Sequence, residues 1–495
     1  MLLQTVLIFD KVFRVMLLKL LPYLKDDELI VYVNKYLYSP FHILVVAILL
    51  TISEIFSIEW PVYYLLLITS FIIPALISED MTPLVPFGLM FQIGVSAKTA
   101  QYEPTIVMGK NIVHFWIIFP IFAIVIVGRL IFDIVTNKDR RHHYPRFLAG
   151  FICIAIAYLV GGLGSPYYSF KSAMFGLREF LAMGGVYLYC VYSLDLKKMH
   201  KDYFAWMFLI FGLAISAEVI ATVSQGVTNA HLFSGWGINN DMAGVMAMTL
   251  GGAGYLAVTK RAWCGWLFVL VMAFMLSVIG LTGSRGGFFT ALFIILIVSI
   301  IIFIKAPLTT TVMTGIITIA FIITFSLLLA YQSEFMHKYF GRILGDGINY
   351  SDINSVLSGR WELWKSGLNS WKENVLLGVG WYHNDWHDFI FQARFHNTYI
   401  QLLATAGLIG IGAYAFHRIE TLIRIFHHPK MEKSFAAICI LGLLIASLVD
   451  CHFFNIYPGF SYAFLLVFIE SRDIKVKEPP KENNLYNTSV IYIYY

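Results

Sequence analysis

Two arginines and three histidines gather in one stretch of an otherwise apolar chain. The stretch covers residues 358–410 and has the sequence SGRWELWKSGLNSWKENVLLGVGWYHNDWHDFIFQARFHNTYIQLLATAGLIG. It begins in the longest polar segment and ends inside a hydrophobic run. Charged groups are unfavourable near lipid, so a cluster at the edge of an apolar run indicates a functional site. Its basic residues are Arg360, Arg394, His383, His387 and His396.

Three arginines are the candidates for binding phosphate. Arg285 lies in the turn GLTGSRGG (280–287), and Arg360 directly precedes the aromatic run WELWKSGLNSW. Arg178 lies about one and a half turns into an apolar run. Guanidinium groups bind phosphate oxygens through paired hydrogen bonds and stay charged, so three of them on one membrane face suit a diphosphate.

A histidine is the candidate for proton transfer. His396 opens an apolar span, and an imidazole with a pKa near the working pH can take a proton from an attacking hydroxyl. The neighbouring cation Arg394 favours the neutral ring that a base requires. The helix start FSGWGINNDMAG (233–244) supplies further polar side chains for binding substrate. The binding candidates are Arg178, Asn239, Asn240, Asp241, Arg394 and Asn397.

Each candidate also has a structural interpretation. Arg178 could pair with the adjacent Glu179 or extend to the membrane interface. Arg285 and His396 could be interfacial residues, and the residues 239–241 could cap a helix. A further group has spacings that could hold a metal, but a solvated turn is favoured because no thiolate or HExxH pattern accompanies it. That group is His383, Asp385, His387 and Asp388.

The composition identifies the kind of protein that must position these groups. Of the 495 residues, 59% are hydrophobic and only 13% are charged, whereas soluble domains carry about 25% charged residues. The apolar runs are long and continuous rather than alternating, which indicates an all-α polytopic membrane bundle and excludes a transmembrane β-barrel. Because five cysteines fall mostly within apolar runs, we expect small core residues rather than disulfides.

Hydropathy divides the chain into five parts. These are an amphipathic interfacial helix (1–25), a transmembrane bundle (41–331), a partly helical loop (332–395), C-terminal transmembrane helices (396–470) and a polar tail (471–495). About 12–14 runs approach the roughly 20 residues needed to span. They lie near 41–58, 60–78, 82–97, 112–136, 146–164, 173–193, 203–221, 241–258, 263–282, 287–304, 311–331, 396–416, 435–451 and 456–470.

Lysine and arginine predict the orientation. One set of connections is basic, including NKDRRHHYPR (137–146), LKKMHK (196–201) and RIETLIRIFHHPKMEK (418–433), whereas the alternate connections 53–60 and 222–240 contain no lysine or arginine. The positive-inside rule then places both termini in the cytoplasm and the loop 332–395 outside. No ATP is present outside, so synthesis there needs a preactivated donor such as a polyprenyl-diphosphate-linked sugar. Arginines can stabilise its leaving group without a metal or another cofactor.

Four motifs in order resemble the O-antigen polymerase and O-antigen ligase superfamily. They are SRGG (284–287), SGRWELW (358–364), LLGVGW (376–381) and HNTYIQLLATAGLIG (396–410). INND (238–241) resembles the asparagine-containing helix start of that family, and the likeness covers about residues 233–450. The sequence departs from the family at Asn374, where a proline is usual, which affects the expected path of the loop.

The resemblance implies a membrane-embedded, metal-independent, inverting glycosyltransferase of the GT-C-like helical type. Arg285 and Arg360 would bind the donor diphosphate, and His396 would be the base or would orient the acceptor. The role of Arg178 follows from its position and not from the resemblance.

We therefore predict a bacterial inner-membrane polymerase that joins oligosaccharide repeats linked to undecaprenyl diphosphate into surface polysaccharide. The alternative is a ligase that moves the finished glycan to lipid A core or another acceptor. Nothing in the sequence separates the two enzymes, because they differ in the acceptor. A transporter fits less well, because its charges would lie near the membrane midplane. The expected partners are the lipid-linked donor, a glycan or lipid acceptor, membrane lipid, a flippase and a chain-length regulator, but no nucleic acid.

Overall fold

The computed structural model is almost entirely helical, as predicted. It describes residues 27–56, 59–90, 104–136, 143–226, 233–234, 237–330, 334–381, 395–454 and 456–474. The predicted interfacial helix 1–25 and the tail beyond residue 474 lie outside these ranges. The same holds for Arg394 and for the group His383, Asp385, His387 and Asp388.

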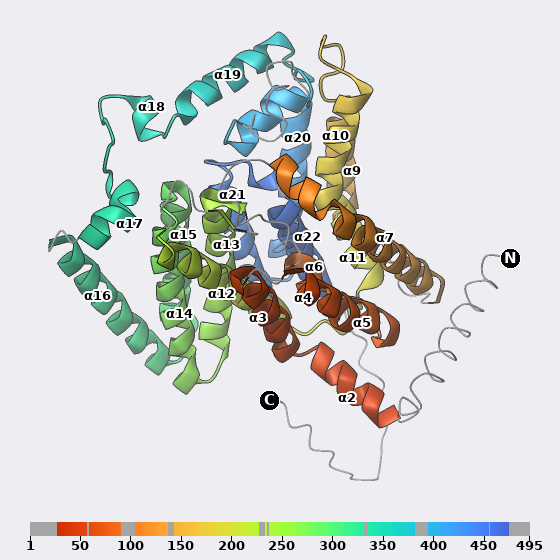
Figure 1. The fold of residues 1–495 in the computed structure, drawn as a ribbon, viewed down its shortest axis with the longest axis horizontal. Helices are drawn as coiled ribbons and strands as arrows, with labels where there is room; N and C mark the ends of the chain where they lie inside the picture. Colours follow the sequence, from red (N-terminus) through yellow and green to blue (C-terminus); the bar gives the residue numbers. More distant parts are fainter. Residues whose placement is uncertain are drawn as a thin grey trace.

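The N-terminal half builds a bundle of short and long helices (Figure 1). Its elements are α2 (Asp27–Leu37), α3 (Pro40–Phe56), α4 (Glu59–Leu66), η2 (Leu67–Ile72), α5 (Ile73–Ile77), η3 (Thr82–Leu84), α6 (Val85–Met90), α7 (Pro104–Thr136), α9 (Leu148–Val160), α10 (Phe170–Phe180), η5 (Leu181–Gly185), α11 (Val186–Ser193) and α12 (Tyr203–Ser224).

The C-terminal half begins with two paired antiparallel strands of two residues each, and the second strand leads into a central helix. Its elements are β1 (Phe233–Ser234), β2 (Gly237–Ile238), α13 (Asn239–Thr259), α14 (Ala262–Leu281), α15 (Arg285–Lys305), α16 (Leu308–Ala330), α17 (Glu334–Leu344), α18 (Ile353–Val356), α19 (Arg360–Glu373), α20 (Thr398–Phe426), α21 (Met431–Ala446), η8 (His452–Phe454) and α22 (Ile456–Ser471).

Six helices in the described ranges are long and apolar enough to cross a membrane, or eight if two bent pairs each count as one span. Three shorter apolar helices accompany them. The chain is therefore a polytopic membrane protein, and the 12–14 spans that the apolar runs predict stay a prediction, because only the described part of the chain enters this count. Hydropathy does not register breaks: the run 146–164 yields only the 13-residue α9, and the run 60–78 is divided by the π-helical η2.

The core is built around α13, which packs against α12, α14, α15 and α21. Its glycines allow this close approach, since a side chain at Gly251 would meet Cys439 and one at Gly252 would meet the Ala205 carbonyl. At the edge of the molecule, α16 exposes most of its apolar side chains, as a lipid-facing helix would (Figure 1). The five cysteines, which all lie in the described ranges, form no disulfide there, and Cys190, Cys439 and Cys451 are buried.

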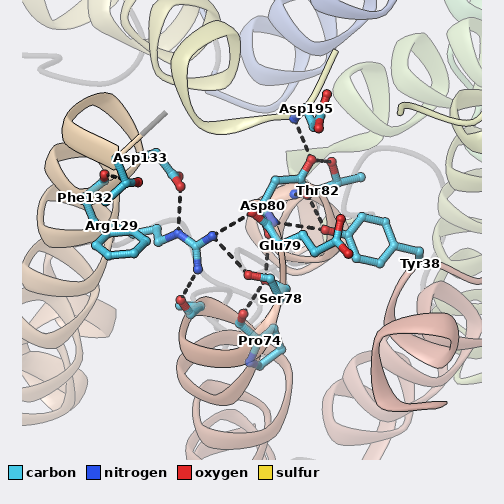
Figure 2. A network of polar contacts seen from close by, with 12 residues as sticks. Tyr38, Pro74, Ser78, Glu79, Asp80, Thr82, Arg129, Phe132, Asp133 and Asp195 are labelled. Atoms are coloured by element: carbon cyan, nitrogen blue, oxygen red, sulfur yellow. Dashed lines mark hydrogen bonds and ion pairs between the residues drawn. The ribbon is translucent and has the colours of Figure 1, made fainter. Parts of the chain in front are cut away.

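Polar residues brace the N-terminal helices (Figure 2). The buried carboxylate of Asp80 accepts hydrogen bonds from the Tyr38 hydroxyl (2.5 Å), the Thr82 amide (2.9 Å) and the Asp195 amide (2.5 Å). On α7, Arg129 donates to the carbonyls of Ala75, Ser78 and Glu79, which lie at and just beyond the end of α5. These groups satisfy one another, so we interpret the network as structural.

The segment between α16 and α20 is partly helical, as predicted, and forms an arch of α17, α18 and α19 (Figure 1). The residues that follow α19, 374–381, form a strap that fills a break in α20 at Gly407 (φ 59°, ψ −154°). There the amides of Val379 and Gly380 donate to the carbonyls of Ala404 and Thr405 at 2.8 and 3.1 Å. The strap therefore satisfies backbone groups that the break leaves without helical partners.

Asn374, where the sequence departs from the pattern of the resembling family, is held by two hydrogen bonds. Its amide nitrogen donates to the Leu163 carbonyl at 3.1 Å, and its side-chain oxygen accepts from the Leu377 amide at 3.3 Å. Both bonds need a side chain that proline does not have. The loop path is therefore set by hydrogen bonding at this position.

Candidate functional site

Arg285 is positioned by the turn between α14 and α15, as the sequence predicts. Ser284 caps α15 by accepting a hydrogen bond from the Gly287 amide at 3.2 Å. The guanidinium of Arg285 then reaches the arch, where Nη1 donates to the Val356 carbonyl at 3.1 Å and Nη2 to the Ser358 hydroxyl at 2.8 Å. This arginine therefore joins the bundle to the segment that precedes Arg360.

Arg360 is the first residue of α19 and follows two residues in the left-handed region, Ser358 (φ 58°) and Gly359 (φ 81°). Its Nη2 lies 3.9 Å from Oδ2 of Asp450, and 16% of its side chain is exposed. Burial lowers the pKa of Arg360, Asp450 opposes this effect and Arg285 adds to it. The guanidinium nevertheless stays charged at neutral pH, because an arginine pKa starts so high.

A third arginine, Arg342 on α17, joins this group. Phe340 packs against Gly280 near the end of α14, which brings α17 close to the turn that carries Arg285. Burial lowers the pKa of Arg342, and the charges of Arg285 and Arg360 lower it further. Three cations that repel one another in a half-buried place form a site suited to a polyanion.

His396 lies beside Asp450, with Nδ1 at 3.1 Å from Oδ1. Three hydrogen bonds create this neighbourhood by joining the start of α20 to residues 447–450. The Thr398 amide donates to the Ser447 carbonyl (3.0 Å), the Asn397 side chain to the Leu448 carbonyl (2.8 Å) and the Thr398 hydroxyl to the Asp450 carbonyl (3.2 Å). His396 itself has φ 47°, an uncommon backbone conformation that is often found at functional sites.

Asp450 keeps its negative charge at neutral pH. Burial alone would raise its pKa, but the hydrogen bond from His396 and the charges of His452 and His396 outweigh burial and lower it. An ionised Asp450 accepts the Nδ1–H of His396, which leaves Nε2 as the lone-pair nitrogen. His396 is 32% exposed, so this nitrogen belongs to a ring that substrate can reach.

A second histidine–carboxylate pair adjoins the first. His452 in η8 is 2% exposed, and its Nδ1 lies 3.5 Å from Oδ1 of Asp241 in the first turn of α13. Gly244 makes room for the ring, since a side chain there would lie 2.6 Å from Nε2 of His452. The site thus contains two imidazoles, two carboxylates and three guanidiniums from α13, α15, α17, α19 and η8, from the residue before the N-cap of α20 and from the segment between α21 and η8.

Other predicted residues are engaged in structural contacts. Arg178 pairs with Glu179 and stacks on Phe175, as its structural interpretation proposed. Asn397 caps α20, because its oxygen accepts from the amides of Tyr399 and Ile400. Both have structural partners, and their predicted contact with substrate stays a prediction.

The residues 239–241 open α13, as predicted. Asn239 is buried and donates to the Thr282 carbonyl at 3.4 Å, while its oxygen accepts from the Asn240 amide at 2.9 Å. Asn240 and Asp241 are half-buried. Asp241 contacts His452 of the site.

Sequence reasoning missed Arg342, Asp450 and His452. The signal for the last two is VDCHFF (449–454), which places an acid and a base between two apolar runs at the same end as His396. The apolar span predicted for 435–451 absorbed Asp450. Arg342 gave no signal beyond its place on a short amphipathic helix.

One comparison with known proteins gives a family. The model of the O-Antigen ligase family matches residues 267–415, which include Arg285, Arg342, Arg360 and His396. No curated protein matches the chain. Over these residues the match confirms the resemblance to the O-antigen polymerase and O-antigen ligase superfamily.

Proposed function

We propose that this chain, which matches the O-Antigen ligase family model over residues 267–415, polymerises undecaprenyl-diphosphate-linked oligosaccharide repeats into surface polysaccharide. The observation that carries the proposal is the placement of three guanidiniums beside a histidine–aspartate pair at one end of the bundle. The arginines are suited to bind a diphosphate, and the histidine–aspartate pair is suited to activate a hydroxyl nucleophile.

Arg285, Arg342 and Arg360 bind the donor diphosphate. Their planar groups match phosphate oxygens, and their mutual repulsion is relieved when an anion arrives. As the glycosidic bond to the diphosphate breaks, the leaving oxygen gains negative charge. Guanidiniums held in place before the reaction stabilise that charge directly, which makes the transfer metal-independent.

His396 activates the acceptor. A sugar hydroxyl approaches Nε2, its oxygen attacks the anomeric carbon of the donor, and its proton passes to Nε2. The bonding electrons of the donor linkage leave with undecaprenyl diphosphate. One displacement of this kind inverts the anomeric carbon. Asp450 holds the ring in the required tautomer and stabilises the imidazolium that forms.

The proposed location is the outer face of the bacterial inner membrane, with both termini in the cytoplasm. The basic connections support this orientation, because lysine and arginine are retained on the cytoplasmic side. The site then faces the compartment where lipid-linked repeats are assembled into polymer.

A ligase is the second candidate, favoured by the description of the matching family as O-Antigen ligase. The two enzymes share the donor and differ in the acceptor. Deleting the gene separates them through the glycan that remains. Single repeats on the final acceptor indicate a lost polymerase, whereas long chains left on the carrier lipid indicate a lost ligase. An unchanged surface glycan would contradict both candidates.

A further inference from the structure

The pair formed by His452 and Asp241 is unused by the mechanism above. His452 is 2% exposed, and its Nδ1 makes no hydrogen bond with any residue in the described ranges. A buried polar nitrogen of this kind ordinarily has a partner. The group it faces is the carboxylate of Asp241, 3.5 Å away, and 21% of that side chain is exposed. The buried imidazole of His452 thus contacts the partly exposed carboxylate of Asp241.

The contacts of the site follow an order. Arg360 contacts Asp450, Asp450 contacts His396, and His452, two residues further along the chain, contacts Asp241. The His452 side chain also contributes to lowering the pKa of Asp450, so the two pairs are electrostatically coupled. One end of this series is cationic and the other is a carboxylate, with the base between them.

The two substrates also differ in charge at the parts that enter the site. The donor carries a diphosphate, which a carboxylate repels. The reacting part of the acceptor is an uncharged sugar, whose hydroxyl groups donate hydrogen bonds that a carboxylate accepts strongly. A carboxylate near the base is therefore suited to the acceptor and unsuited to the donor diphosphate.

We propose that Asp241 binds hydroxyl groups of the acceptor sugar and that His452 is the positioning residue that holds this carboxylate in place. This inference rests on the proposed function, since it names the acceptor subsite of the same site. Asp241 also lies in the first turn of α13, where the helix dipole stabilises a negative charge.

The test separates acceptor binding from chemistry. Purified full-length protein receives the radiolabelled repeat on undecaprenyl diphosphate as donor and the same repeat on a short prenyl diphosphate as acceptor. Asp241→Asn should raise the KM for the acceptor by about 10- to 100-fold, the effect of losing a hydrogen bond to a charged group. Binding of the donor, measured separately by thermophoresis, should be unchanged.

His452→Gln provides a second variant, should Asp241→Asn be poorly folded. It should raise the acceptor KM more than it lowers kcat, because Asp241 remains but is less well held. Glu373→Gln is the matched control, since it removes an exposed carboxylate from the end of α19 and should change neither constant.

The outcomes are distinct. A change in acceptor KM with unchanged donor binding supports the subsite. An unchanged acceptor KM in both variants, or a loss confined to kcat, overturns it while the proposed function stands. A wild-type protein that forms no glycosidic bond from these substrates overturns the proposed function, and the subsite falls with it.

Discussion

Charge is distributed unevenly among the residues of the site. Burial and the charge of Arg285 lower the pKa of both Arg342 and Arg360, and the carboxylate of Asp450 lies 3.9 Å from Arg360. Holding like charges close together lowers the free energy of unfolding. Such perturbed charges are common at functional sites. We infer that the arginine group is organised for its ligand rather than for stability.

Replacing arginine by lysine tests how the ligand is bound. Arg285→Lys and Arg360→Lys should each lose most activity although the charge is retained, because lysine presents a point charge instead of a planar fork. Removing one preorganised partner from a developing anion costs about 2.7–4 kcal/mol in the transition state. Turnover of a lipid-linked repeat by the purified variants measures the loss.

The control for these variants is Arg261→Lys at the exposed N-terminus of α14, which should retain wild-type turnover. If the two site variants also run near the wild-type rate, the arginines are only anchors of the arch.

Replacing Asp450 by asparagine tests the pairing with His396. Asp450→Asn should lower turnover by about 100- to 10,000-fold, the range for losing an oriented base. Donor binding should not weaken, because the substitution removes a negative charge beside Arg360. Parallel loss of donor binding and turnover would show that Asp450 mainly holds the arginines.

The sequence predicted Arg285, Arg360 and His396 because each lies in a motif, next to the start of an apolar or an aromatic run. The structure brings these three together, but it also shows why other residues were harder to assess. Arg178 and Asn397 looked alike in sequence to the residues of the site. Their partners in the structure are local, namely Glu179 for Arg178, as one interpretation of the sequence proposed, and the backbone of α20 for Asn397.

At the scale of elements, α20, which begins two residues after His396, is a broken helix. Gly407 interrupts the helix, and the strap 374–381 fills the break. The conformation of Gly407, φ 59° and ψ −154°, is essentially restricted to glycine. A side chain there would also overlap the backbone of Leu376.

Gly407→Ala should therefore destabilise the protein by about 1–3 kcal/mol or more through backbone strain. The measurement is the unfolding temperature in detergent, followed by fluorescence-detected size exclusion.

Gly412→Ala in the same helix is the matched control. Nothing lies within 4 Å of a side chain at that position, and alanine should stabilise the helix by about 0.5–1 kcal/mol. Equal behaviour of the two variants would contradict the role of the break.

The helical pattern of these elements was readable from sequence, whereas the break was not. Residues 396–416 form one apolar run with several glycines, and hydropathy treats Gly407 and Gly412 alike. What distinguishes them is a tertiary contact with a strap about 30 residues earlier in the chain, which no local pattern encodes.

At the scale of the whole molecule, the site is expected on the outer face. Ser351 and Asn369 are exposed on the arch, and His427 is exposed at the opposite end of α20. Thr421, which the sequence also places inside, is only 3% exposed and would escape labelling on either side.

Cysteines at Ser351 and Asn369, introduced into a cysteine-free background, should react with an impermeant thiol reagent in intact cells. A cysteine at His427 should react only in inverted vesicles. The opposite pattern would reverse the orientation and remove the arch from the outer compartment.

The all-α membrane fold was predictable because composition and long apolar runs determine it. The number of full-length spans was not, since bends such as the one between α10 and α11 depend on packing. The burial of α13 at the centre likewise follows from small residues that meet partners distant in sequence.

The central claim is that His396 removes the proton from the acceptor. The most direct measurement compares wild-type protein with His396→Gln in an assay with the lipid-linked repeat. Glutamine keeps a polar side chain of similar reach but cannot take the proton, so we predict normal folding and donor binding with turnover reduced about 100- to 10,000-fold. Substantial turnover by His396→Gln would reduce His396 to a structural residue and contradict the mechanism.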